Sequence, residues 1–192
     1  KSKVAESLSE FHGNYRYNLM DENLRRFNSK IPTVYLWDDH ETKNNWWPGW
    51  RLRDARYTID DGAILARNAR SAFFDYAPIA RRAHQAGRIY RTLHQGPLVD
   101  VFTLDSRSFR APNHVTGPLP KDGQISFLGR TQCDWLLDAL SASKSIWKVI
   151  ATPQPLSAIV YHGQNGHDGI GNGLKGAPRY RELELARLLR GI

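Results

Sequence analysis

The sequence predicts an α/β fold in which a largely parallel or mixed sheet is flanked by helices. Three short apolar runs, rich in β-forming residues, alternate with segments of helical periodicity, and polar residues follow the runs. Strands that alternate with helices favour a sheet with parallel character. With 41% hydrophobic residues among 192, the chain suits one globular domain or part of a larger one.

The predicted strands are residues 31–37, 99–104 and 147–152. The first is mostly apolar, starts beside Pro32 and is too short for a helix, so we interpret it as a buried strand. Residues 38–41 follow it directly, and residues 105–107 follow the second strand. Because α/β folds build their sites just past the carboxyl ends of strands, we expect the chemistry to lie there.

Short helices are predicted at residues 3–11, 21–28, 60–76, 130–142 and 179–190. Asp21 is expected to cap the second helix, because an Asp side chain there accepts a hydrogen bond from a first-turn amide. The third helix carries a face of small residues and ends at Pro78. That face consists of Ala63, Ala66, Ala69, Ala72 and Phe73. Residues 42–58, 111–129 and 156–178 are predicted loops.

Composition excludes some classes of protein. Six Trp, eight Tyr and seven Phe are too many for a disordered segment, and no apolar run approaches the ~20 residues of a membrane span. The first residues lack both a Met and a signal peptide, so we expect that the chain does not begin where its gene begins.

Cys133 is the single cysteine and is predicted to be a small buried side chain rather than a metal ligand. The net charge of +8 favours anionic partners.

The run Asp38-Asp39-His40-Glu41 is the first candidate for chemistry. Carboxylate oxygens are the preferred ligands of hard cations, and imidazole is another common ligand. Two adjacent buried carboxylates repel each other, and a metal ion relieves that repulsion. The amide oxygen of Asn44 is a further neutral ligand. The alternative is a solvated turn, in which Asp-Asp pairs are common.

Three other groups of residues are weaker candidates. Arg107 has the planar fork that binds phosphate, or it forms a structural ion pair that holds its loop. His162 and His167 lie in a glycine-rich loop. They are either metal ligands or ordinary loop residues. The tryptophans after the acidic run either stack on a base or ring of a ligand or line the cleft. They are Trp46, Trp47 and Trp50.

Several motifs together resemble the PhoD-type alkaline phosphatases, a branch of the metallophosphoesterases. They are WDDHETKNNWWP at 37–48, GRIYR at 87–91, GPLVDVFTLDSRSFR at 96–110, WKVIA at 147–151 and RELELARLL at 181–189. Leu128-Gly129, Gln132 and Trp135-Leu136 match as well and lie between the third and fourth of these motifs. They occur in the family's order and cover nearly the whole chain. The resemblance identifies residues 1–192 as the central part of one PhoD-like domain of the metallophosphoesterase sandwich type. The family's first metal motif, a Gly-Asp strand end, and its last, an Asp-x-His, are both missing, so the segment alone is expected to be inactive.

The resemblance implies metal-dependent hydrolysis of phosphate esters, either monoesters or diesters, by metal-activated hydroxide. Iron and calcium ions are the implied cofactors, with Asp38, Asp39 and Asn44 at the metal site. His40 and Arg107 take catalytic roles, His40 at the phosphate or the leaving group and Arg107 on the phosphoryl oxygens. Asn45 and Trp46, with Arg107, are expected to contact the substrate.

The family also implies a secreted or periplasmic protein with a phosphate ester as its partner and no stable nucleic-acid partner. The alternative that the sequence leaves open is a non-catalytic, basic module that binds phosphate or nucleic acid. The basic charge, the tryptophan cluster and the missing outer metal motifs support that alternative.

Overall fold

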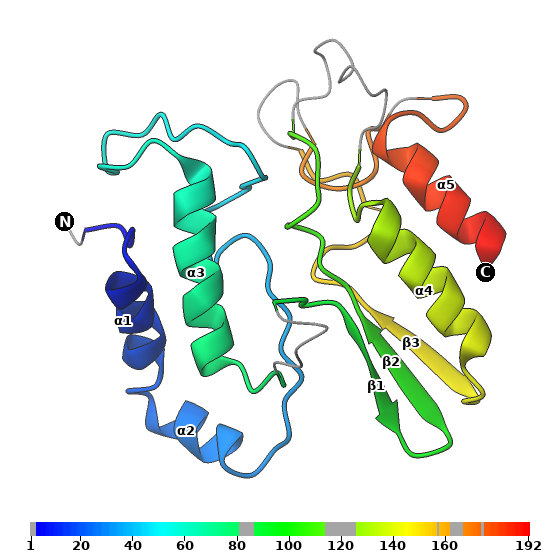
Figure 1. Ribbon diagram of the computed structural model, residues 1–192, viewed down its shortest axis with the longest axis horizontal. Coiled ribbons are helices and arrows are strands. Elements are labelled where there is room, and N and C mark those ends of the chain that lie inside the picture. The colour runs from blue at the N-terminus through cyan, green and yellow to red at the C-terminus, as the bar shows by residue number, and fades with distance from the viewer. Residues whose placement is uncertain (1–2, 81–86, 114–125, 157, 162–166, 174) are drawn as a thin grey trace.

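The computed structural model describes residues 3–80, 87–113, 126–156, 158–161, 167–173 and 175–192. Three helices form one side of the molecule, and a small sheet with two helices forms the other (Figure 1). The first three helices are α1 (Leu8–Asn18), α2 (Glu22–Asn28) and α3 (Gly62–Tyr76). The strands are β1 (Arg91–Gln95), β2 (Val99–Thr103) and β3 (Trp147–Ala151), and the remaining helices are α4 (Arg130–Ala142) and α5 (Arg181–Gly191).

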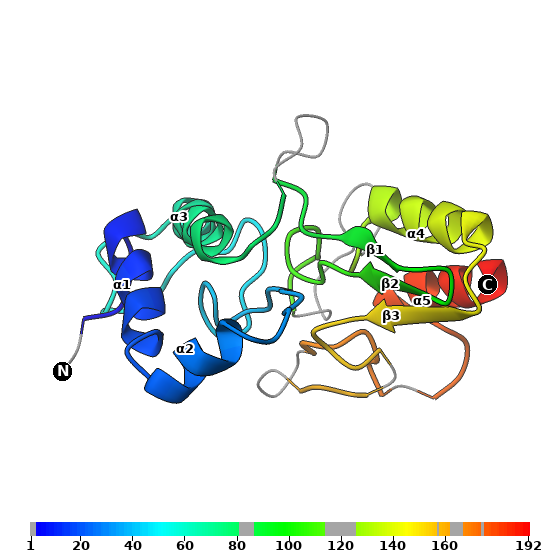
Figure 2. The same ribbon diagram turned by 90° about the horizontal axis from the view of Figure 1, so that it is seen from below.

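The sheet is mixed, with strand order β1-β2-β3. β1 pairs antiparallel with β2, which places Arg91 opposite Thr103, and β2 pairs parallel with β3, which places Thr103 opposite Ala151. Helices α4 and α5 pack on this sheet through one core cluster that includes Phe102, Leu136 and Leu188. The mixed α/β class predicted from the sequence is therefore confirmed. Figure 2 shows the sheet and its two helices beside the helical part of the molecule.

The outer strand β3 leaves apolar side chains uncovered. The first three residues of β3 are exposed, and two of them, Trp147 and Val149, are large and apolar. Ile150 is partly buried and packs against the core cluster. Because successive side chains of a strand point to opposite faces, Trp147 and Val149 lie on the face opposite to Ile150. In the described part of the chain, the sheet is therefore open on one face.

The helical part is built around α3. Asp61 caps α3 by accepting a hydrogen bond from the Ala63 amide at 2.8 Å, and Asp21 caps α2 in the same way, as predicted. Ala69 and Ala72 are fully buried, so the predicted face of small residues is packed in the core along the central turns of α3, although Ala63 is exposed. Small side chains there allow α1 to lie close against α3.

Two predicted elements are wrong and one was missed. Residues 31–37 do not form a strand with any described part of the chain, and Ile31 and Val34 are exposed. A β-rich sequence becomes a strand only where a neighbouring strand accepts and donates its backbone hydrogen bonds. The first helix begins at Leu8 rather than at residue 3, because Ser7 and Glu10 form a capping box there.

The missed strand, β1, is polar and was not recognisable by its own composition. Its residues form a strand because they fold back on β2 in a hairpin whose turn contains Gly96 at φ 63°. This positive φ is readily adopted by glycine. Cys133 is fully buried, as predicted.

A hydrogen bond across the molecule joins its two parts. The indole Nε1 of Trp37 donates to Asp105 Oδ1 at 2.9 Å, although the two residues are 68 positions apart. Asp105 follows β2, and Gln132 of α4 holds its backbone N–H and C=O, both at 2.8 Å. The segment that precedes residue 38 is thereby fixed to the end of the sheet. None of the helices in the part of the chain that the structure describes is both long and apolar enough to cross a membrane.

Glu6 provides a test of how the helical part is stabilised. Its buried carboxylate accepts hydrogen bonds from the backbone of Thr58 and Ile59, and the Ile59 amide is the main cause that lowers its pKa. A carboxyl group with a lowered pKa stabilises the fold above its ordinary pKa of about 4.3, and this contribution is lost as the pH falls below that value.

We therefore expect Glu6→Gln to lower the melting temperature at pH 7. The gap between variant and wild type should close below roughly pH 4, as the wild-type carboxylate protonates. Melting curves followed by circular dichroism from pH 7 to pH 3 measure both effects. Glu22→Gln, a change at an exposed position of α2, is the control; a gap that stays constant over the whole range would contradict the role of the Glu6 charge.

Candidate active site

Residues 38–45 form a tight turn that is closed by its own hydrogen bonds. Asp39 Oδ2 accepts the Asn45 amide at 2.7 Å, and the Asp39 carbonyl accepts the Lys43 amide at 2.7 Å. Glu41 accepts the Asp38 amide at 2.8 Å. Asn45 has φ 57°, a left-handed conformation that Asn tolerates better than most residues. The turn therefore has one defined shape, which holds the side chains of its acidic run in place.

Arg107 lies behind this turn with its side chain fully buried. Its Nε donates to Asp38 Oδ1 at 2.6 Å, and its Nη2 is 3.6 Å from Asp39 Oδ2. Its two terminal nitrogens also donate to both carboxylate oxygens of Asp168, at 2.9 and 2.7 Å. Burial opposes the charge of Arg107, but the bonds to Asp168 and Asp38 outweigh it and raise its pKa. The repulsion between the adjacent carboxylates of the turn is thus relieved, in this chain, by a guanidinium.

Asp168 is the buried centre of a wider polar cluster. Besides Arg107, it receives hydrogen bonds from the side chains of Asn113, at 2.8 Å, and Gln154. Arg110 approaches it at 3.3 Å and also donates to its backbone carbonyl. Burial disfavours its ionisation, but the bonds from Arg107 and the nearby Arg110 charge prevail, so the pKa of Asp168 is lowered. The cluster joins three segments that are distant in sequence.

Arg181, at the start of α5, fastens the loops around this cluster. Its Nη2 donates to the carbonyls of Ala111 and Pro112, at 2.6 and 2.8 Å, and its Nη1 donates to His167 and Gly169, at 2.9 and 3.1 Å. Burial lowers its pKa to about 10. These bonds satisfy loop carbonyls that would otherwise be buried without a partner.

The predicted site residues fall on two sides of the turn. His40 and Asn44 face outward: the His40 side chain is 77% exposed, and its Nε2 lies 3.0 Å from Asn44 Oδ1 and 3.9 Å from Asp39 Oδ1. Trp46 is buried and packs edge-to-face against Trp37, with ring centroids 5.4 Å apart. The structure thus brings His40, Asn44 and Asp39 together, whereas Arg107 reaches Asp39 from the buried side of the turn and Trp46 packs in the core.

Arg107 was assigned two alternatives, a phosphate-binding fork or a structural ion pair. All three of its guanidinium nitrogens are bonded to protein carboxylates, so the geometry favours the ion pair. Its partners are Asp38 and Asp168 rather than the neighbouring Asp105, which instead accepts the amides of Arg107 and Ser108.

The described residues provide only part of a metal site. Among them, no three His, Cys, Asp or Glu side chains lie together as a metal ion requires. The donors that do converge are Asp39 Oδ1, Asn44 Oδ1 and the imidazole of His40. Two of these are hard oxygen donors of the kind that divalent cations prefer. These groups would supply some of the ligands of a metal ion but not a complete set.

Comparison with known proteins shows the family to which the chain belongs. The family model of the PhoD-like phosphatases matches residues 1–192. The chain belongs to the PhoD-like phosphatase family. It is 28% identical over 155 residues to alkaline phosphatase D of Bacillus subtilis (strain 168), a match that covers 76% of this chain and 26% of that protein.

A solved structure of PhoD has the same fold. It superposes with a TM-score of 0.69 at 21% sequence identity, and the match covers 88% of this chain and 34% of that chain. The chain therefore spans about a quarter to a third of the length of the PhoD-like phosphatases that it matches.

The sequence of this PhoD-like chain did not indicate the cluster behind the turn. Asp168 and Asn113 lie in predicted loops, and Gln154 lies between two prolines after a predicted strand; no motif marks any of them. The one available signal was that His167-Asp168 interrupts a run of glycines. His167 lies near the cluster, where burial lowers its pKa, whereas His162 lies outside the described residues.

The buried cluster gives a stability prediction. Asp168→Asn leaves Arg107 and Arg110 buried with less negative charge beside them, and breaking a buried ion pair costs about 3–5 kcal/mol. We expect a loss of this size in the free energy of unfolding, measured by urea denaturation. Asp134→Asn removes an exposed ion pair with Arg187 and should cost at most about 1 kcal/mol. Equal losses in the two variants would contradict the central place of Asp168.

Proposed function

We propose that this chain is the central part of a metal-dependent enzyme that hydrolyses phosphate esters, and that the turn at residues 38–45 forms part of its active site. Membership of the PhoD-like phosphatase family supports a phosphoesterase. The observation that carries the proposal is that the oxygens of Asp39 and Asn44 both lie within 4 Å of the exposed imidazole of His40, at 3.9 and 3.0 Å.

The rigidity of the turn suits this role. Catalytic groups have to be held close to their productive geometry by neighbours that are themselves fixed. Here the outward-facing donors are backed by a buried network that runs from Asp38 through Arg107 to Asp168. We assign Arg107 to this network as a positioning residue, which acts on the site through Asp38 and Asp39.

Asp39 and Asn44 would supply oxygen ligands to a metal ion, together with groups from other parts of the enzyme. When bound, such an ion lowers the pKa of a coordinated water and so provides a hydroxide nucleophile. His40 has an exposed imidazole next to these oxygens, which places it where it can donate a proton to the leaving oxygen of the ester. Asn45 holds the shape of the turn through its amide.

Further properties follow from the family resemblance and belong to the same proposal. Iron and calcium are the proposed ions, and the proposed location is the periplasm or the cell exterior. The net charge of +8 is consistent with a phosphorylated substrate, because it raises the local concentration of anions.

The direct test uses the full-length protein. Metal analysis and hydrolysis of 4-nitrophenyl phosphate and bis(4-nitrophenyl) phosphate are measured before and after chelation. We expect hydrolysis that is lost on chelation and restored by added metal. Binding of phosphate without hydrolysis, at any metal content, would instead support the non-catalytic module.

His40→Asn tests the proton-donor role. In the full-length enzyme, we expect kcat/KM for an alkyl phosphate to fall by about 10²–10⁴, the usual contribution of a general acid. The loss should be much smaller for 4-nitrophenyl phosphate, because its leaving group departs without a proton. The melting temperature should not change, since the side chain is exposed.

The control for this variant is His94→Asn on β1, a second exposed histidine that pairs with Asp100 away from the turn. It should leave kcat/KM unchanged with both substrates. An equal loss for both leaving groups in His40→Asn would remove the proton-donor role.

Arg107→Ala tests the positioning role. We expect a loss of about 3–5 kcal/mol in the free energy of unfolding, because two buried carboxylates lose their cation. In the molecules that stay folded, metal affinity should change by about 10–100-fold, as for other groups that orient metal ligands. Metal titrations and kinetics corrected for the folded fraction measure this. Unchanged metal affinity with lost turnover would instead favour direct binding of phosphate by Arg107.

A further inference from the structure

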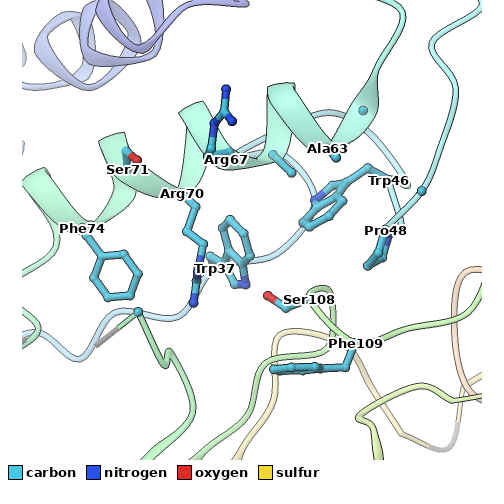
Figure 3. Close-up of a pocket in the computed structure, with 14 residues that line it drawn as sticks. Trp37, Trp46, Pro48, Ala63, Arg67, Arg70, Ser71, Phe74, Ser108 and Phe109 are labelled. Atoms are coloured by element: carbon cyan, nitrogen blue, oxygen red, sulfur yellow. The ribbon is translucent and has the colours of Figure 1, made fainter. Parts of the chain in front are cut away.

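A concave region lies beside the turn at residues 38–45, apart from His40 and Asn44. It is a cavity of about 620 Å³ between α3 and the segments that follow Trp37 and β2. Four aromatic rings contribute to its wall, and in Figure 3 they surround an open space below α3. The rings belong to Trp37, Trp46, Phe74 and Phe109. A cavity of this size and character is typical of a site for a small organic ligand.

One cation enters this cavity. Arg70 extends from α3 between the rings of Trp37 and Phe74 (Figure 3). Its Nε is buried and has no hydrogen-bond partner in the part of the chain that the structure describes. Among these residues its guanidinium also forms no ion pair and no hydrogen bond, whereas all three nitrogens of Arg107 and both terminal nitrogens of Arg181 donate to protein oxygens.

The position of the guanidinium is fixed by its neighbours. Its central carbon lies 5.5 Å from the centroid of the Phe74 ring. Gly87, at φ 75°, approaches so closely that a side-chain carbon there would lie 3.0 Å from Nη2 of Arg70. Arg70 is therefore held in place by packing, while its buried Nε has no acceptor among the residues that the structure describes.

A partly buried charge without a partner is unfavourable, since it has lost water and gained no protein acceptor. Burial accordingly lowers the pKa of Arg70, with only the more distant charge of Asp105 acting in the other direction. Asp105 acts on Arg70 through its charge alone, since the described hydrogen bonds of its carboxylate come from Trp37 and two backbone amides. An anion in the cavity would supply the missing acceptors.

We infer that this cavity binds an organic anion, in which an aromatic or similarly apolar body packs against the rings and a carboxylate or phosphate group pairs with Arg70. The site is distinct from the outward-facing donors of the turn, and the inference does not depend on the proposed function. Both parts of the ligand are needed: the rings recognise the body, and the planar fork of Arg70 recognises the charged group by two parallel hydrogen bonds.

The test is calorimetric titration of the full-length protein after removal of metal, with four probes that separate ring from charge. Phenylphosphonate and benzoate carry both, benzyl alcohol carries the ring alone, and inorganic phosphate carries the charge alone. We expect the two aromatic anions to bind at least about tenfold more tightly than the other two, the scale of one charge-assisted hydrogen bond.

Arg70→Met should abolish the advantage of benzoate over benzyl alcohol, and Arg70→Lys should retain part of it, because an ammonium keeps the charge without the fork. Arg16→Met removes a positive charge at an exposed position of α1 and is the matched control. It should leave all four affinities unchanged. The melting temperature of Arg70→Met should not fall, since an unpaired cation is replaced by an apolar chain.

The inference is overturned if benzoate binds no better than benzyl alcohol, or if Arg70→Met, shown to be folded, binds benzoate as tightly as the wild type. The inference is also overturned if inorganic phosphate displaces bound benzoate and binds more tightly than benzoate does, because the ring would then contribute nothing to binding. Hydrolysis that fails in the metal-loaded enzyme leaves these expectations unchanged, so the two proposals fail separately.

Discussion

The buried ion pair between Arg107 and Asp168 is the interaction on which the arrangement of the site depends. It joins the end of β2 to the glycine-rich loop, two segments 61 residues apart, by a two-pronged contact of 2.9 and 2.7 Å. Compared with a well-packed apolar pair, a buried ion pair gives little net stability. Its effect is to specify geometry, since any displacement of either loop leaves a buried charge without its partner.

The acidic turn takes its shape from the same pair. The third nitrogen of Arg107 bonds to Asp38, and the guanidinium also lies near Asp39. Two neighbouring carboxylates can therefore sit at a partly buried position, and the oxygens of Asp39 and Asn44 stay beside the exposed ring of His40. The turn thus has a buried side that contains the guanidinium and an exposed side that carries His40 and Asn44.

The helical part and the sheet meet around Trp37. Its indole bonds to Asp105 and packs against Trp46 and Phe73, so one aromatic side chain connects α3, the acidic turn and the end of β2. The same ring forms one wall of the cavity that contains Arg70. Arg70 and Arg107 both lie near this junction, but within the described part of the chain Arg107 has carboxylate partners and Arg70 has none.

The sequence by itself determined the elements whose signals are local. The strands at 99–104 and 147–152 and the helices at 60–76 and 130–142 follow from apolar period, capping and proline. The acidic run at 38–41 and the amides at 44 and 45 were also recognisable as a candidate site, because they lie close together in the sequence. The tertiary structure alone decided that residues 31–37 stay without a strand partner in the described chain and that the polar residues of β1 become a strand, since pairing depends on what lies alongside. It also decided which cation meets Asp38. Arg107 is 69 residues away in sequence, and Asp168 is a further 61 beyond it, so no local pattern connects the three. Only the folded chain brings them within hydrogen-bonding distance. There the buried guanidinium pairs with carboxylates because a buried charge without a partner is unfavourable.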